Sequence, residues 1–275
     1  MEAEVLDRAD AHLDAGILGT GNVACMLLDV KAVLLVGGLG TRLRSLVSST
    51  PKVLASVGGR SFLELLIRQL RSHGIHRLVL CTGYLADQIE TNFGDGKAWD
   101  VTIEYSHEEK ALGTAGAVKR AQHYLRDVSD FFVLNGDSFL EVDFQDLMNF
   151  HRAHGALATM AVLRVEHAGR YGTVQVDASG HVKSFAEKTG SDAPGLVNGG
   201  VYIFSHSVLQ CIPEQPTSLE RDVFPRLLGQ GMYAQEQHGI FIDIGTPADY
   251  MRAQQLCDSL TAVASRGPTG SPAQN

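Results

Sequence analysis

Short apolar segments alternate with longer amphipathic ones through the first half of the chain. Lys31–Val36, Leu78–Thr82 and Phe131–Leu134 are continuous apolar runs of strand length, and Val101–Ser106 alternates between apolar and polar residues. Runs of the first kind are typical of parallel strands that are buried on both faces of a sheet. The amphipathic segments between them predict helices over about 61–73, 84–92, 114–125 and 143–154.

Local signals mark where several of these helices begin and end. Ser61 and Glu64 form a capping box, and Gly74 ends the helix that starts there. Asp143 can cap the helix that runs to about His154, and we expect His151 and His154 at the surface of that helix. This β-α-β rhythm predicts an α/β fold, with a Rossmann-like, mostly parallel sheet and helices on both faces.

The second half of the chain is richer in strands. Asp177–Gly180 predicts a hairpin turn, and Thr246 followed by Pro247 predicts the start of a last helix. The predicted strands cover 157–165, 172–176, 181–186, 201–204 and 240–242. No internal repeat is found, so we expect one domain over 30–258 with a mixed sheet, divided into halves at 30–156 and 157–258.

Both ends of the chain lack a clear pattern. Residues 1–29 could hold a short amphipathic helix, but glycines interrupt it, and we expect an extension of uncertain structure. Residues 259–275 are rich in Ser, Gly and Pro towards their end, which predicts a disordered tail.

Composition limits the kind of protein. Hydrophobic residues make up 44% of the 275 residues, enough for a full core without disulfide or metal support. The formal charge of −8 argues against a protein that coats nucleic acid, although a small anionic ligand in a local basic pocket stays open. Four separated cysteines, no apolar run of membrane-spanning length and an acidic start predict a cytoplasmic protein with reduced thiols and no membrane partner.

A glycine-rich loop follows the first predicted strand. Three glycines in Gly37–Leu43 leave backbone N–H groups free to approach a phosphate or a base edge. Arg42 and Lys52 add two cations within ten residues. The loop lacks the Gly-Lys-Ser/Thr of a P-loop and the third glycine of a dinucleotide site, where Leu43 stands.

Two aspartates follow predicted strands directly. Asp137 ends Asn135-Gly-Asp, and Asp243 lies in Phe241–Gly245 in what looks like the same arrangement. Carboxylates at the carboxyl ends of parallel strands face the ligand crevice. Two such oxygen ligands at one sheet edge suit Mg²⁺, which binds one or two carboxylates together with water and phosphate oxygens.

These motifs together resemble the sugar-nucleotide pyrophosphorylases, nucleotidyltransferases that join a sugar 1-phosphate to a nucleotide. The resemblance covers about residues 30–257, and within the family the chain looks most like the D-glycero-D-manno-heptose 1-phosphate guanylyltransferases of surface-polysaccharide synthesis. The matching motifs, in order, are Gly37–Leu43, Pro51-Lys52, Leu112–Gly116, Gly136-Asp137, Tyr171-Gly172, Glu187-Lys188, Asn198–Gly200 and Asp243–Gly245.

The resemblance implies direct in-line attack by a phosphate oxygen of the sugar 1-phosphate on the α-phosphorus of a nucleoside triphosphate, with loss of pyrophosphate. It implies that 30–156 binds the nucleotide and 157–258 the sugar phosphate. Catalytic roles fall on Arg42, Lys52 and Asp137, and Mg²⁺ on Asp137 and Asp243. The nucleotide-binding residues would be Val36, Gly37, Gly38, Gly40, Thr41, Glu108, Gly113 and Thr114, and the sugar-phosphate-binding residues Gly172, Glu187, Lys188 and Asn198.

Glu108 bears on the choice of base, because by counting back from Gly113 it stands where this family places a base-edge contact. Guanine presents N1–H and N2–H₂ side by side, and a carboxylate can accept from both. Uracil and thymine present one N–H between two carbonyl groups, which a carboxylate repels. Glu108 therefore favours GTP.

Several alternatives stay open. The sugar could be mannose, glucose or an N-acetyl amino sugar, and the nucleotide UTP or dTTP. An alternative hypothesis from another class of protein is a non-catalytic regulatory subunit that binds a nucleotide-sugar. It is disfavoured because the expected catalytic residues are all present. A glycosyltransferase would need an Asp-x-Asp metal site, which Asp137-Ser-Phe does not supply. Homo-oligomerisation cannot be read from the sequence.

Overall fold

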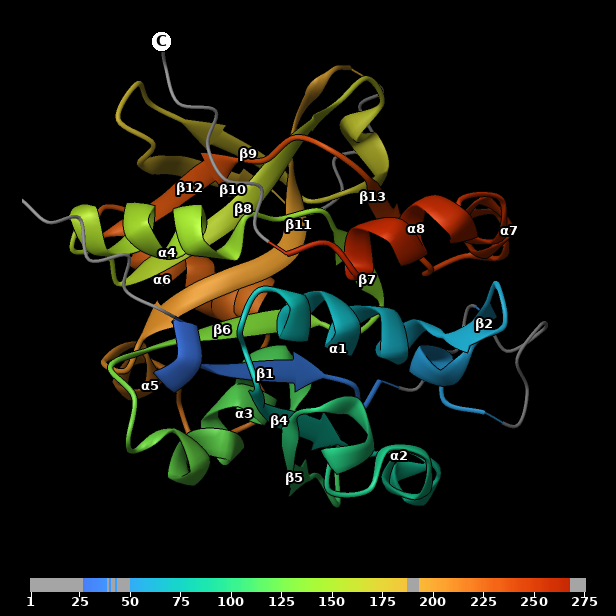
Figure 1. Ribbon diagram of the computed structural model, residues 1–275. Coiled ribbons are helices and arrows are strands. Elements are labelled where there is room, and N and C mark those ends of the chain that lie inside the picture. Colours follow the sequence, from blue (N-terminus) through green and yellow to red (C-terminus); the bar gives the residue numbers. More distant parts are fainter. Residues whose placement is uncertain (1–26, 39, 41–42, 44–49, 187–192, 268–275) are drawn as a thin grey trace, which may run out of the picture.

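A sheet of nine strands with helices on both faces forms the body of the protein (Figure 1). The computed structural model describes residues 27–38, 40, 43, 50–186 and 193–267. The strands of this sheet are β1 (Lys31–Leu35), β4 (Arg77–Thr82), β5 (Thr102–His107), β6 (Asp130–Asn135), β8 (Ala158–Val165), β9 (Thr173–Val176), β10 (Val182–Ala186), β11 (Gly195–Ser205) and β12 (Met232–Glu236).

The helices and the short elements complete the described chain. Two small sheets pair β2 (Ser56–Val57) with β3 (Arg60–Ser61) and β7 (Ser138–Leu140) with β13 (Phe241–Asp243). The α-helices are α1 (Phe62–Ser72), α2 (Ala86–Phe93), α3 (Gly113–Arg120), α4 (Phe144–Ala153), α5 (Val208–Cys211), α6 (Phe224–Leu227), α7 (Pro247–Gln255) and α8 (Cys257–Ala264). A single π turn, Leu219–Val223, precedes α6, and 3₁₀ turns cover Leu27–Asp29, Lys52–Leu54, Lys97–Trp99, Ala121–Leu125 and Ala168–Arg170.

Strand alternation divides the interior into two cores. On β1, Ala32 and Leu34 pack in one core with residues of α1 and α4, whereas Val33 packs in the other with residues of α3 and α6. Successive side chains of a strand point to opposite faces, so a strand that is apolar throughout must be covered on both sides. The predicted α/β architecture is therefore confirmed.

The order of the strands places the first half of the chain beside the second. The strands β6, β1, β4 and β5 are neighbours in that order and run parallel. Next to β6, the long strand β11 runs antiparallel and also pairs with β8 and β9. The carboxyl ends of β1, β4 and β6 thus meet at one edge of the sheet. Through its pairing with β6, β11 joins the strands of the second half of the chain to those of the first half.

Most of the predicted helix boundaries are confirmed by hydrogen bonds. The Ser61 hydroxyl accepts from the backbone N–H of Glu64 at 3.2 Å, Asp143 accepts from Asp146 N–H at 2.9 Å, and Thr246 accepts from Asp249 N–H at 3.3 Å. The expected hairpin turn at Asp177–Gly180 joins the antiparallel pair β9 and β10. Capping and turn residues bond to groups a few positions away, so helix starts and hairpin turns can be predicted from neighbouring residues alone.

The expectation that Asp243 repeats the arrangement of Asp137 is wrong. Asp137 follows β6 of the large sheet, but Asp243 ends β13, which pairs only with β7 among the described strands. The register Asp243↔Ser138 and a hydrogen bond from Ile244 N–H to the carbonyl oxygen of Asp137 nevertheless bring the two aspartates together. The two aspartates therefore meet through the small antiparallel sheet of β7 and β13, and not because both end strands of the large sheet.

Two further expectations need correction. His151 is buried at 2% exposure, because its Nδ1 lies 2.8 Å from the Thr159 hydroxyl and its Nε2 lies 3.6 Å from Asp130 Oδ1. The helix α8 runs to Ala264, beyond the start of the tail predicted at residue 259. Its Leu260, Val263 and Ala264 are buried against the core that α1 also enters, and this packing keeps the segment helical.

Candidate active site

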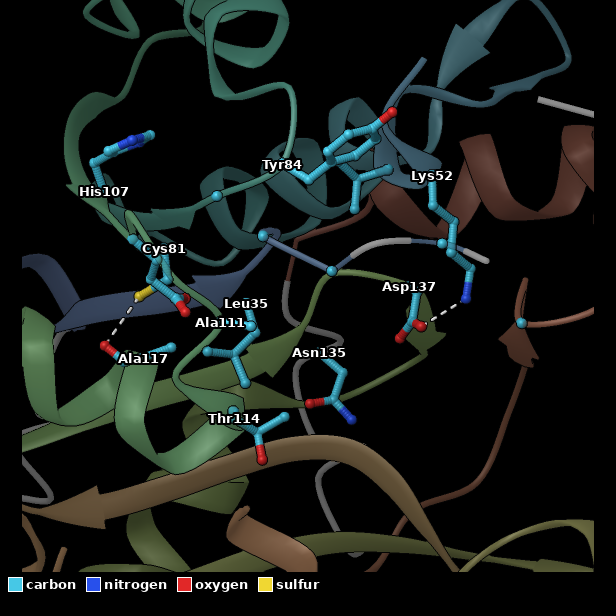
Figure 2. Close-up of a pocket in the computed structure, with 18 of the residues that line it drawn as sticks. Leu35, Lys52, Cys81, Tyr84, His107, Ala111, Thr114, Ala117, Asn135 and Asp137 are labelled. Carbon is cyan, nitrogen blue, oxygen red and sulfur yellow. Dashed lines mark hydrogen bonds and ion pairs between the residues drawn. The ribbon is translucent and has the colours of Figure 1, made fainter. Parts of the chain in front are cut away.

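A cavity of about 680 Å³ opens at the carboxyl ends of β1, β4 and β6 (Figure 2). This is where ligands bind in open α/β sheets. The residues that line it are Leu35, Gly37, Gly38, Gly40, Lys52, Val53, Cys81, Gly83, Tyr84, His107, Glu108, Glu109, Ala111, Gly113, Thr114, Ala117, Asn135, Asp137 and Gly245. They come from five separate stretches of the chain and one residue after β13.

One end of the cavity carries a cluster of three charges. The Lys52 ammonium lies 2.6 Å from Asp137 Oδ2, as Figure 2 shows, and 4.0 Å from Asp243 Oδ1. The Lys52 side chain is 11% exposed, whereas those of Asp137 and Asp243 are 41% and 34% exposed, so water reaches the carboxylates more than the ammonium group. One cation therefore faces two carboxylates, and the cluster keeps a net negative charge.

The electrostatics of Asp243 agree with that excess charge. Burial, together with the negative charge of Asp137, raises the pKa of Asp243 to about 6, and Lys52 offsets only part of this rise. A carboxylate pair with one shared ammonium group is short of positive charge. The donor set suits a divalent cation such as Mg²⁺, which prefers carboxylate oxygens and keeps several waters. Within the described ranges, no three His, Cys, Asp or Glu side chains gather as a metal cage.

Close backbone approaches explain two of the glycines. A Cβ on Gly136 would lie 2.6 Å from the Leu35 carbonyl oxygen, and one on Gly113, at φ +74°, would lie 2.5 Å from that of Thr217. Neither position has room for a side chain. At Gly38, in contrast, no atom of the described residues lies within 4 Å of an added Cβ. Gly38 therefore leaves its space to the cavity itself.

Glu108 lies at the other end of the cavity. Its Oε2 accepts a hydrogen bond from the backbone N–H of Leu112 at 2.9 Å. Burial raises its pKa, although Leu112 N–H and the positive charge of Arg120 oppose this rise. The carboxylate thus helps to hold the turn before α3, and its second oxygen can still accept from a ligand.

The side chain of Thr114 is used inside the fold. Its hydroxyl donates to Glu220 Oε2 at 3.0 Å and accepts from Leu219 N–H at 2.7 Å. This ties the start of α3 to the π turn. Thr114 also lines the cavity, but its hydroxyl proton is already used by Glu220.

Gly172 and Asn198, the expected sugar-binding residues, lie together but outside the cavity wall. Asn198 N–H donates to the Gly172 carbonyl oxygen at 2.9 Å. The Asn198 side chain accepts from Gly200 N–H at 2.9 Å and donates to the Tyr202 hydroxyl at 2.7 Å. Val36 is buried behind the glycine loop, where its N–H donates to Cys81 O at 3.0 Å.

Four of the expected residues, Thr41, Arg42, Glu187 and Lys188, lie outside the described residues. The structure also brings in cavity residues that the sequence analysis did not assign, namely Cys81, Gly83, Tyr84, His107 and Asn135. Cys81 lies near the end of β4, and Gly83 and Tyr84 follow this neighbour of β1. The prediction of a mostly parallel sheet was the available signal, since the carboxyl ends of parallel strands meet at one edge. No helix within the described residues has the length and apolarity needed to cross a bilayer.

Comparison with known proteins agrees with this geometry. The family model described as nucleotidyl transferase matches residues 31–259. The mannose-1-phosphate guanylyltransferase catalytic subunit beta of Xenopus tropicalis is 37% identical over 243 residues, 87% of this chain and 67% of that protein. The corresponding subunit of Drosophila melanogaster is 39% identical over 229 residues, 82% of this chain and 62% of that protein. The chain thus spans about two thirds of the length of these relatives.

Among solved structures, HddC from Yersinia pseudotuberculosis complexed with GMP-PN is similar to this chain. The TM-score is 0.73 and the sequence identity 32%, over 82% of this chain and 98% of that chain.

Proposed function

The chain belongs to the nucleotidyl transferase family and is a sugar-1-phosphate nucleotidyltransferase, and we propose that it transfers a guanylyl group from GTP to a manno-configured sugar 1-phosphate. D-glycero-D-manno-heptose 1-phosphate is the first candidate, on the motifs of the sequence. Mannose 1-phosphate is the second, favoured by the relatives named as mannose-1-phosphate guanylyltransferases. The cavity supports either reading, since acidic groups that suit guanine and a phosphate-bound cation lie at its two ends.

We propose that the triphosphate lies along the glycine loop. Gly37, Gly38 and Gly40 line the cavity between Glu108 and Lys52, and the bare Gly38 leaves room for phosphate oxygens. Backbone N–H groups in such a loop bind anions without the cost of desolvating a charged side chain. Arg42 and Thr41 would extend this contact, and Arg42 would bind the departing pyrophosphate.

Lys52 and the aspartates act where the two substrates meet. In the proposed reaction, a phosphate oxygen of the sugar 1-phosphate attacks the α-phosphorus, and the bond to pyrophosphate breaks in line with it. Lys52 offsets the negative charge that accumulates there, and it is held in reach by Asp137. Asp137 and Asp243 would hold Mg²⁺, which when bound neutralises phosphate charge. Lys188, Glu187, Gly172 and Asn198 would bind the sugar phosphate.

A screen of pyrophosphate release tests the proposal. Each of GTP, ATP, UTP and dTTP is offered with a panel of sugar 1-phosphates that includes the heptose, mannose and glucose compounds. We expect the highest kcat/KM with GTP and a manno-configured sugar, dependent on added Mg²⁺. Preference for UTP or dTTP, or for a gluco-configured sugar, would overturn the assignment.

We also propose a cytoplasmic location, consistent with the free cysteines Cys81, Cys211 and Cys257.

A further inference from the structure

A buried hydroxyl group connects the cavity to the predicted sugar-binding strand. Tyr202 on β11 is fully buried, and burial raises the pKa of its phenol well above the usual range. Asn198 Nδ2 donates to this hydroxyl at 2.7 Å, and the Asn135 side chain lies near enough to oppose part of the rise in the Tyr202 pKa. The phenol therefore holds the Asn198 amide and lies close to the Asn135 amide, and the two asparagines stand on the adjacent strands β11 and β6.

The backbone is shaped to let these groups meet. The pairing of β11 with β8 is irregular between Asn198 and Tyr202. Within that irregularity Gly200 has φ +75°, and a Cβ there would lie 3.2 Å from Asn135 Nδ2. A residue with a side chain would press on the Asn135 amide.

Asn135 itself is incompletely paired. Its Oδ1 is buried and has no hydrogen-bond partner among the described residues. The residue lines the cavity two positions before Asp137, and Figure 2 shows it between Thr114 and Asp137. A buried amide oxygen without a partner is costly, and a water, an ion or a ligand can complete it; because Asn135 also lines the cavity, a ligand there can do so.

We propose that Asn135 is a further substrate-binding residue, which accepts a hydrogen bond from a hydroxyl group of the sugar 1-phosphate, and that Tyr202 is the positioning residue that holds Asn198 in place for that substrate. The inference rests on the proposed function, because it assumes that Asn198 faces the sugar. An amide oxygen needs a donor, and ionised phosphates have none to offer, whereas sugar hydroxyls do.

The two amides offer complementary groups to the sugar. Asn198 Oδ1 is occupied by Gly200 N–H and one of its N–H groups by Tyr202, so one N–H is left to donate. Asn135 supplies the acceptor. A donor and an acceptor on adjacent strands can select both the presence and the direction of sugar hydroxyls, and a substrate that lacks the matching hydroxyl leaves Asn135 unpaired.

The test uses Asn135→Ala and Tyr202→Phe in the full chain, with Tyr124→Phe as a matched control. The Tyr124 hydroxyl donates to the Tyr105 carbonyl oxygen at 2.8 Å, outside the cavity. Tyr124→Phe therefore also removes a hydrogen-bonding hydroxyl, but one that is remote from the substrate. We expect both test variants to raise KM for the sugar 1-phosphate about tenfold, while KM for GTP stays within about twofold.

The decisive measurement uses sugar 1-phosphates in which single hydroxyl groups are replaced by fluorine, which cannot donate. One such analogue should lose about tenfold in kcat/KM with the wild-type protein and nothing further with Asn135→Ala. The inference is overturned if every analogue loses equally with both proteins, or if Tyr202→Phe and Tyr124→Phe lower the melting temperature alike and leave KM unchanged. Because Asn135→Ala keeps the Tyr202 ring, its result stands even if Tyr202→Phe does not fold.

Failure of the proposed function gives a different result. If the wild-type protein does not use GTP with a manno-configured sugar, that assignment fails. The fluorinated series is then built on the sugar 1-phosphate that the protein does turn over, and the same comparison decides the role of Asn135.

Discussion

At the scale of single residues, Lys52, Asp137 and Asp243 form the most consequential group of charges. Replacing either aspartate with asparagine keeps the shape and removes one anionic ligand. We expect Asp137→Asn and Asp243→Asn each to lower Mg²⁺-dependent turnover by about 100-fold or more, because the metal offsets charge worth several kcal/mol at the reacting phosphates.

The measurement is the rate of pyrophosphate release against Mg²⁺ concentration, with melting temperatures to show that the fold is retained. Asp146→Asn, which removes the same charge from α4 outside the cavity, should behave as the wild-type protein does. A variant that keeps a near-normal rate at limiting Mg²⁺ would remove its aspartate from the set of ligands.

Glu108 carries the prediction on base choice. Glutamine has one oxygen in place of two. It can keep the hydrogen bond from Leu112 N–H and turn its amide nitrogen to the guanine donors, or serve guanine and leave Leu112 unpaired. Either outcome loses a charge-assisted bond, about 1.5–3 kcal/mol, so Glu108→Gln should lower the GTP/UTP ratio of kcat/KM by roughly tenfold to a hundredfold.

Glu109→Gln is the matched control, since Glu109 also lines the cavity and loses the same charge. Its GTP/UTP ratio should stay within about twofold of the wild-type value. An unchanged ratio in Glu108→Gln would mean that another group reads the base.

At the scale of elements, the glycine loop and the end of β6 use glycine for different reasons. Gly136→Ala should destabilise the fold by about 1–3 kcal/mol, because its Cβ would press on the Leu35 carbonyl oxygen. Gly38→Ala should leave the melting temperature unchanged and raise KM for GTP about tenfold or more, because its methyl group would occupy cavity space. Thermal unfolding and steady-state kinetics of both variants separate these effects, and a Gly38→Ala protein with normal KM would place the phosphates elsewhere.

At the scale of the whole molecule, a charged contact joins the central sheet to α4. The hydrogen bond with His151, followed by that with Arg152, holds the pKa of Asp130 below its usual range. A carboxyl with a lowered folded-state pKa stabilises the fold above its unfolded pKa of about 3.9, and this stabilisation is lost as the pH falls through the folded value.

We therefore expect the free energy of unfolding to drop more steeply below about pH 4 in the wild-type protein than in Asp130→Asn. Denaturant unfolding between about pH 2.5 and 7 measures both slopes. Asp100→Asn, at a side chain that is 75% exposed, should keep the wild-type slope. Parallel curves for the wild-type protein and Asp130→Asn would show that this contact does not contribute to acid stability.

The sequence alone determined the elements of this protein and the order of its motifs. Apolar periodicity, capping residues and glycines act over a few neighbouring residues, so the strands Lys31–Leu35 and Asp130–Asn135 and the caps at Ser61, Asp143 and Thr246 could be read directly. The glycine loop and the following lysine also indicated the phosphate-binding chemistry, because few residue types can approach a phosphate so closely.

Only the tertiary structure decided which distant residues meet. Lys52 and Asp137 are 85 residues apart, and Asp243 joins them through a small sheet that no local pattern announces. His151 is buried because Thr159 and Asp130 satisfy its ring, and Asn135 and Asn198 come together near Tyr202 because β6 and β11 are neighbours. Such contacts depend on strand order and packing between remote segments, which the spacing of residues along the chain does not encode.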